Sequence, residues 1–103
     1  MALQQSPRTP QNQPSLTALY RRPLVCDLTG KSRSALYRDI SKGLFTAPVN
    51  IGGGRVAWPG YEVEQINKAR IAGADDDAIK ALVAELEAGR STASSEVKAD
   101  DGQ

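Results

Sequence analysis

The sequence predicts a mainly helical fold that carries one small β-hairpin and ends in an additional amphipathic helix. Three observations lead to this prediction. Two short segments with helical apolar spacing meet at Gly30, two runs containing β-branched and aromatic residues flank Gly52–Gly54, and a regular apolar stripe follows Gly73. Together they indicate one small folded unit with a glycine turn near its start.

The two ends of the 103-residue chain differ in composition from its middle. Residues 1–17 are rich in Gln, Ser, Thr and Pro, and residues 90–103 are largely polar. Neither segment offers enough apolar surface to offset the entropy of ordering it, so both are expected to be disordered tails. The folded domain is expected to span residues 18–72, and the additional acidic helix to lie in residues 73–89.

The first helix is expected over Pro23–Thr29. Proline suits the first turn of a helix, because its fixed φ is helical and its missing N–H would have no partner there. Leu24, Val25 and Leu28 are expected to face the core. Cys26 lies among them and is expected to be a small core residue.

A tight turn is expected to separate this helix from a second one. Gly30 can adopt the left-handed conformation that ends a helix, and Ser32 is a good N-cap for a helix over Arg33–Lys42. Leu36 and Ile40 would form the buried stripe of that helix. Two short helices joined by a glycine-containing turn are typical of a helix-turn-helix motif.

A β-hairpin is expected after the second helix. The runs Pro48–Ile51 and Arg55–Trp58 flank three consecutive glycines, which favour a turn. Trp58 is expected in the core, because a large aromatic side chain is usually buried. A hairpin beside a helix-turn-helix predicts a winged helix-turn-helix.

A third helix is expected from Pro59, with Val63, Ile66 and Ile71 as its apolar residues and Gly73 at its end.

An acidic helix is expected to follow, because Asp75–Asp77 place negative charge where the helix dipole favours it. Its apolar stripe has the spacing of one helix face, and Gly89 is expected to end it. A helix this short cannot stay folded alone, so it packs on the same chain or a second copy, or it binds another protein such as RNA polymerase. The residues of this stripe are Ile79, Leu82, Val83 and Leu86.

Charge is distributed unevenly along the chain. Residues 20–58 hold seven basic and two acidic residues, a net charge of +5, whereas residues 59–103 hold five basic and ten acidic residues, a net charge of −5. A basic segment that contains a helix-turn-helix predicts binding to double-stranded DNA, because phosphate contacts by Lys and Arg supply most non-specific affinity.

The start of the second helix is the expected DNA-reading element, since such helices enter the major groove at their N-terminal end. Arg33 and Arg38 can each bind a guanine through two hydrogen bonds. Tyr37 either contacts DNA or packs half-buried, and Arg55 either contacts the backbone from the hairpin or only solubilises it. The candidate DNA-binding residues are Arg21, Arg22, Lys31, Ser32, Arg33, Ser34, Tyr37, Arg38, Lys42 and Arg55.

Several other functions are not supported by the composition. One cysteine and no histidine argue against a zinc site or an internal disulfide, and no cofactor is expected. Gly52–Gly54 are not followed by Lys-Ser or Lys-Thr, as a phosphate-binding loop requires. No catalytic constellation is visible, so an enzyme and a small-molecule substrate are not expected. The chain has no apolar stretch of membrane-spanning length and no signal peptide, so a cytoplasmic location is expected.

Several landmarks make the stretch Leu19–Ile66 similar to the AlpA family of phage regulators, which is close to excisionase-like and MerR-like winged helix-turn-helix proteins. The matching segments are Thr29–Phe45 (TGKSRSALYRDISKGLF), Pro48–Trp58 (PVNIGGGRVAW) and Glu62–Ile66 (EVEQI). The sequence departs from the common family pattern at three positions, which are Leu24, Thr46 and Ile66.

The resemblance implies a phage or prophage regulator. We expect a sequence-specific, DNA-binding transcriptional regulator, and specifically an activator. Two alternatives stay open: an excision factor that bends DNA for a recombinase, and an adaptor that binds another protein through the helix after Gly73.

Overall fold

The computed structural model describes the backbone of residues 18–101 and the side chains of residues 18–91. The tail expected at residues 1–17 lies outside the described residues. In chain order the described elements are β1 (Leu19–Tyr20), α2 (Arg22–Thr29), α3 (Arg33–Ser41), β2 (Val49–Gly52), β3 (Arg55–Pro59), α4 (Gly60–Ile71) and α5 (Asp76–Asp101).

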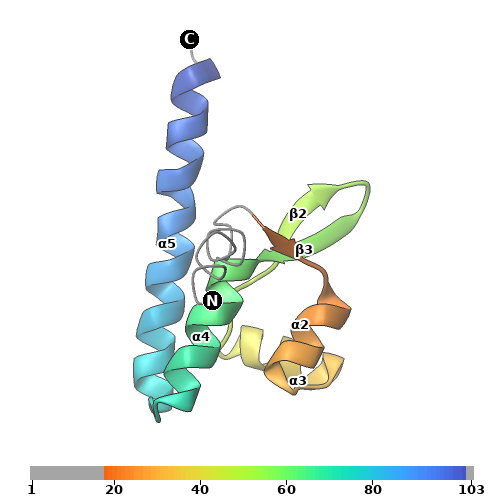
Figure 1. Ribbon diagram of the computed structural model, residues 1–103, viewed down its shortest axis with the longest axis vertical. Helices are drawn as coiled ribbons and strands as arrows, with labels where there is room; N and C mark the ends of the chain where they lie inside the picture. Colours follow the sequence, from red (N-terminus) through yellow and green to blue (C-terminus); the bar gives the residue numbers. More distant parts are fainter. Residues whose placement is uncertain (1–17, 102–103) are drawn as a thin grey trace, which may run out of the picture.

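The arrangement of these elements confirms the predicted fold class (Figure 1). Helices α2 and α3 form one corner of the molecule, and the β2–β3 hairpin projects beside them. Helices α4 and α5 pack against each other, and α5 continues well past the other described elements toward its C-terminal end. The fold is therefore a mainly helical, winged helix-turn-helix arrangement with one added C-terminal helix.

The turn between α2 and α3 forms as the residue types predict. Gly30 has φ +74°, and its N–H donates to the Cys26 carbonyl over 2.9 Å. A side chain at this φ would be strained, so glycine ends α2 with little backbone cost. Ser32 then accepts a hydrogen bond from the Ala35 N–H over 3.1 Å and caps α3.

The sheet has three antiparallel strands in the order β1–β3–β2, one more than the predicted hairpin. Strand β1 pairs Tyr20 with Trp58 and Leu19 with Pro59. The Tyr20 ring lies so close to Gly60 that an added Cβ there would be 2.7 Å from it. Gly60 thus allows β1 to close over the start of α4.

One core joins the helix-turn-helix to α4 and α5. Its fully or nearly fully buried members include Val25, Leu36, Phe45, Trp58, Val63, Ile66, Ile79 and Val83. Because α5 supplies two of them, this helix is part of the folded unit in the same chain.

Two predicted core residues, Leu24 and Leu28, are instead exposed, so those predictions are wrong. Leu24 and Leu28 are 42% and 41% exposed, whereas Val25, which lies near them on α2, is fully buried. Ile71 is 85% exposed, because it is the last residue of α4 and lies beyond the packed part of that helix. Cys26 is only partly buried at the edge of the core.

Gly89 does not end the last helix, contrary to expectation. The helix runs on to Asp101, and so includes residues 90–101, for which a tail was expected. Gly89 does not have a positive φ, unlike a glycine that ends a helix in the left-handed conformation. A glycine inside a helix costs only about 1 kcal/mol relative to alanine.

Candidate DNA-binding surface

The first turn of α3 presents polar groups to solvent. Arg33 and Ser34 are exposed, and Ser32 is exposed beside them at the helix cap. The Ser32 hydroxyl oxygen accepts from Ala35 but its proton is still available to a further acceptor. The N-terminal end of a helix also carries partial positive charge, so this end of α3 is suited to an anionic ligand.

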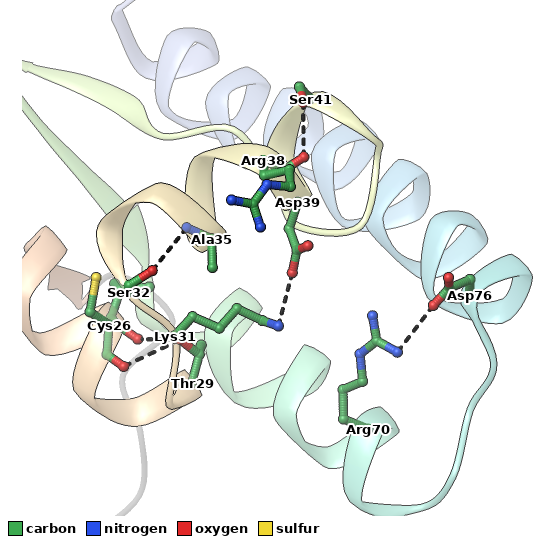
Figure 2. Close-up of polar contacts among 11 residues, drawn as sticks. Cys26, Thr29, Lys31, Ser32, Ala35, Arg38, Asp39, Ser41, Arg70 and Asp76 are labelled. Carbon is green, nitrogen blue, oxygen red and sulfur yellow. Dashed lines mark hydrogen bonds and ion pairs between the residues drawn. The ribbon is translucent and has the colours of Figure 1, made fainter.

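Helical spacing sorts the remaining α3 side chains into two rows. Ser34, Arg38 and Ser41 follow each other at intervals of four and three residues and are all exposed, on the side opposite buried Leu36. The Ser41 hydroxyl donates to the Arg38 carbonyl over 2.8 Å, which leaves the Arg38 guanidinium uninvolved in that bond (Figure 2). This outward row, together with exposed Arg33 next to Ser34, is the part of α3 that can enter a groove.

The basic residues in and next to α3 differ in whether they form ion pairs within the protein. Among the side chains described, residues 18–91, Arg33, Arg38 and Lys42 form no ion pair. Lys31 instead has its Nζ 3.0 Å from an Asp39 carboxylate oxygen (Figure 2). A DNA contact by Lys31 would therefore compete with Asp39, whereas Arg33 and Arg38 are free to bind a ligand.

Tyr37 lies on the second row of α3, one turn after Arg33, and packs half-buried. Its ring is edge-on to Trp58, with 6.3 Å between ring centroids and 63° between ring planes. Trp58 is fully buried and donates its indole N–H to the Thr46 carbonyl over 2.8 Å. Tyr37 thus connects α3 to the strand that follows the hairpin tip.

The hairpin β2–β3 has the properties of a wing. Gly52, Gly53 and Gly54 all have positive φ between +62° and +99°, so its tip needs glycine at each position. Asn50 Oδ1 accepts from the Gly52 N–H over 2.8 Å at the bulge before the tip. Arg55 is exposed directly after the tip. The basic side chain closest to the wing tip in sequence is therefore open to solvent.

The basic residues before α2 occupy its N-terminal end. Arg21 is the exposed N-cap residue, and Arg22 is the first residue of the helix and is partly buried. Neither forms an ion pair among the side chains of residues 18–91.

A shallow pocket of about 250 Å³ lies between the helix-turn-helix turn and α4. Lys31, from the turn, and Arg70, from α4, both line the pocket, and each lies close to a carboxylate (Figure 2). The Arg70 Nη1 lies 3.3 Å from Asp76, as Lys31 lies near Asp39. Because these charges balance, the pocket does not favour an anion.

The apolar stripe of α5 is used within the chain. Ile79 is fully buried and Val83 is 5% exposed, while Leu82 and Leu86 pack partly buried against the same core. Of the alternatives left open for this stripe, packing on the same chain describes Ile79 and Val83, because the core of their own chain covers both.

The sequence prediction missed a buried ion pair between α4 and α5. Glu62 is fully buried, and Arg90 donates to both of its carboxylate oxygens over 2.7 Å. The sequence held part of the signal for this pair. Glu62 lies one turn before Ile66, one of the apolar residues of the predicted helix, and a carboxylate on a buried helix face requires a partner. Thr46, also fully buried, has a hydroxyl without a hydrogen-bond partner among the described residues.

Two other features are not found among the described residues. No group of three or more metal-ligating side chains is present among them. None of the helices among them is long and apolar enough to cross a membrane.

Comparison with known proteins places this fold in a family. The family described as prophage CP4-57 regulatory protein (AlpA) matches residues 18–71, just over half of the chain. Uncharacterized protein ORF88 of Enterobacteria phage P4 is 47% identical over 53 residues, a match that covers 52% of this chain and 60% of the phage protein. The chain thus aligns with less than two thirds of that relative, and no solved structure matches it. The matched region holds the helix-turn-helix, the wing and α4, so the chain belongs to the AlpA family of prophage regulatory proteins.

Proposed function

We propose that this protein is a sequence-specific, DNA-binding transcriptional regulator of phage or prophage genes that reads the major groove with α3. The observation that carries the proposal is the pair Arg33 and Arg38. Both are exposed on a capped helix that follows a tight turn, Arg33 in its first turn and Arg38 in its last, and neither has an ion-pair partner among residues 18–91. Arginines in this position can bind base edges and phosphates.

The wing and the start of α2 supply backbone contacts in this proposal. Arg55 would contact a phosphate or the minor groove from the wing, and Arg21 and Arg22 would contact the backbone near α2. Ser32, Ser34 and Lys42 would add phosphate contacts along α3. Tyr37 supports the geometry of α3 through Trp58, and Lys31 contributes only where a phosphate displaces Asp39.

The test begins with selection of a duplex from a random-sequence DNA library by the wild-type protein. Arg33→Ala and Arg38→Ala are each expected to weaken binding to the selected duplex by about 10- to 100-fold, the loss for one arginine that reads a base. Lys68→Ala is the matched control, because Lys68 is an exposed cation on α4 outside the proposed surface. Equal affinity of all three variants, measured by fluorescence anisotropy, contradicts the proposal.

Footprinting on phage or prophage DNA that contains the selected sequence separates regulation from excision. A regulator, and in our proposal an activator, is expected to protect a defined site near a promoter and to raise expression of a reporter. An excision factor would instead fill several adjacent sites cooperatively and bend the DNA. An adaptor acting through the α5 stripe is disfavoured, because Ile79 and Val83 are buried in the same chain.

A further inference from the structure

Helix α5 touches the loop from which the wing starts. We call residues 46–47, Thr46 and Ala47, the wing root, because β2 begins two residues later. The Ala47 N–H donates to Glu87 Oε2 over 2.8 Å, and the Ala47 carbonyl accepts from Arg90 Nη2 over 2.6 Å. Two side chains of α5 therefore hold both backbone polar groups of one wing-root residue.

Arg90 is itself held in place by α4. Its Nε and Nη2 donate to the two oxygens of buried Glu62, each over 2.7 Å. The hydrogen bonds to Glu62 raise the pKa of Arg90 above its ordinary value, so the guanidinium stays charged. A planar guanidinium bound at two points has little freedom to move, so the group that reaches Ala47 has a defined position.

The other side of the wing root contacts the tryptophan that supports α3. The Thr46 carbonyl accepts from the Trp58 indole over 2.8 Å, and the Trp58 ring packs edge-on against Tyr37. The wing root thus lies between α5 and Trp58, and Trp58 lies between the wing root and α3. A continuous set of contacts connects Arg90 to the helix that carries the candidate DNA-binding residues.

We propose that Glu87 and Arg90 are positioning residues for DNA binding, which set the wing relative to α3 by holding Ala47. This inference rests on the proposed function. Ala47 and Glu62 lie inside the family match of residues 18–71, whereas Glu87 and Arg90 lie outside it. The added helix α5 therefore acts on DNA binding without contacting DNA.

The exposed pair Arg70–Asp76 offers a matched control. It also joins α4 to α5, over 3.3 Å, but Arg70 makes no hydrogen bond to the wing root in the described structure. Arg70→Ala and Arg90→Ala each remove one positive charge from the same pair of helices. A difference between them in DNA binding reports the contacts of Arg90 and not its charge alone.

The experiment uses the full chain and the duplex selected by the wild-type protein. Arg90→Ala is expected to weaken binding by about tenfold, equivalent to one charged hydrogen bond, and to lose hydroxyl-radical protection where the wing contacts the DNA. Arg70→Ala is expected to stay within about twofold of wild type with an unchanged footprint. Arg90→Lys keeps the charge but cannot hold Glu62 at two points, so its affinity is expected to fall between these values.

Trp58 gives a readout that does not require DNA, because it is the only tryptophan in the chain. Release of the wing root is expected to make Trp58 fluorescence more accessible to acrylamide in Arg90→Ala, but not in Arg70→Ala. If Arg90→Ala fails to fold, Glu87→Ala carries the test, because it removes only the acceptor of the Ala47 N–H and leaves the Arg90–Glu62 pair.

The inference is overturned if the folded Arg90→Ala and Glu87→Ala variants bind the selected duplex as tightly as Arg70→Ala does, with the same footprint and the same Trp58 quenching. A wild-type protein that enriches no duplex contradicts the proposed function itself and this inference with it. Enrichment by the wild type, followed by equal binding of the variants, contradicts only the positioning role.

Discussion

Helix α3 and the α4–α5 pair use arginine in opposite ways. Arg33 and Arg38 are exposed and form no ion pair among the described side chains, whereas Arg90 is bound to buried Glu62 and to the Ala47 backbone. An exposed charge can be given to a ligand at little cost to the fold, but a buried charge must keep its partner. Direct contact with DNA and stability of the fold are thus expected to depend on different arginines in this chain.

Removal of Glu62 is expected to give the largest loss of stability of the changes considered. Glu62→Ala leaves Arg90 without its partner and is expected to lower the free energy of unfolding by about 2–4 kcal/mol, near the lower end of the range for a broken buried pair because Arg90 is partly exposed. Urea denaturation followed by Trp58 fluorescence measures the change. Glu85→Ala, which removes an exposed carboxylate from α5, is the control and is expected to change little. A similar midpoint for both variants is inconsistent with a stabilising role for the pair.

Two glycines, Gly30 and Gly89, differ in backbone conformation and should respond oppositely to substitution by alanine. Gly30→Ala is expected to lower the free energy of unfolding by about 1–2 kcal/mol, because alanine is strained at its positive φ. Gly89→Ala is expected to raise it by about 0.5–1 kcal/mol, because Gly89 lies within a helix. An added Cβ meets nothing within 4 Å at either site, so backbone conformation alone distinguishes them. Thermal unfolding gives both changes, and shifts of the same sign contradict the assigned conformations.

The exposed pair Arg70–Asp76 is expected to show the smallest effect. It spans α4 and α5 like the Glu62–Arg90 pair, but its side chains are 37% and 67% exposed. A double-mutant cycle with Arg70→Ala and Asp76→Ala is expected to give a coupling free energy below about 0.5 kcal/mol. A coupling free energy as large as the loss of stability in Glu62→Ala would show that burial does not distinguish the two ion pairs.

Local sequence signals predicted the elements well but not always the faces that they bury. Gly30 and Ser32 correctly marked the turn, because a left-handed glycine and a serine cap act within a few residues. Leu24, Val25 and Leu28 were expected to share the buried face of α2, yet only Val25 is fully buried. In a helix of eight residues, a few apolar side chains do not determine which side meets the rest of the protein.

The candidate site shows the same division. Exposed arginines on a capped helix were predictable from spacing and charge, because both are properties of one short segment. The support for that helix was not predictable, since it depends on Arg90 meeting Glu62 28 residues earlier and Ala47 43 residues earlier. Strand β1 was missed for a related reason, because two residues are too few to show an alternating pattern.

The sequence by itself determined the order of the helices and the hairpin, the glycine turn, the three glycines of the hairpin tip, and the basic character of the first half. These features follow from φ preferences, capping and net charge, all of which act locally. Only the tertiary structure decided that α5 belongs to the core, that its helix passes Gly89, and that Arg90 pairs with buried Glu62. The physical reason is that burial of Glu62 creates the need for a distant cation, and packing alone determines which one meets it.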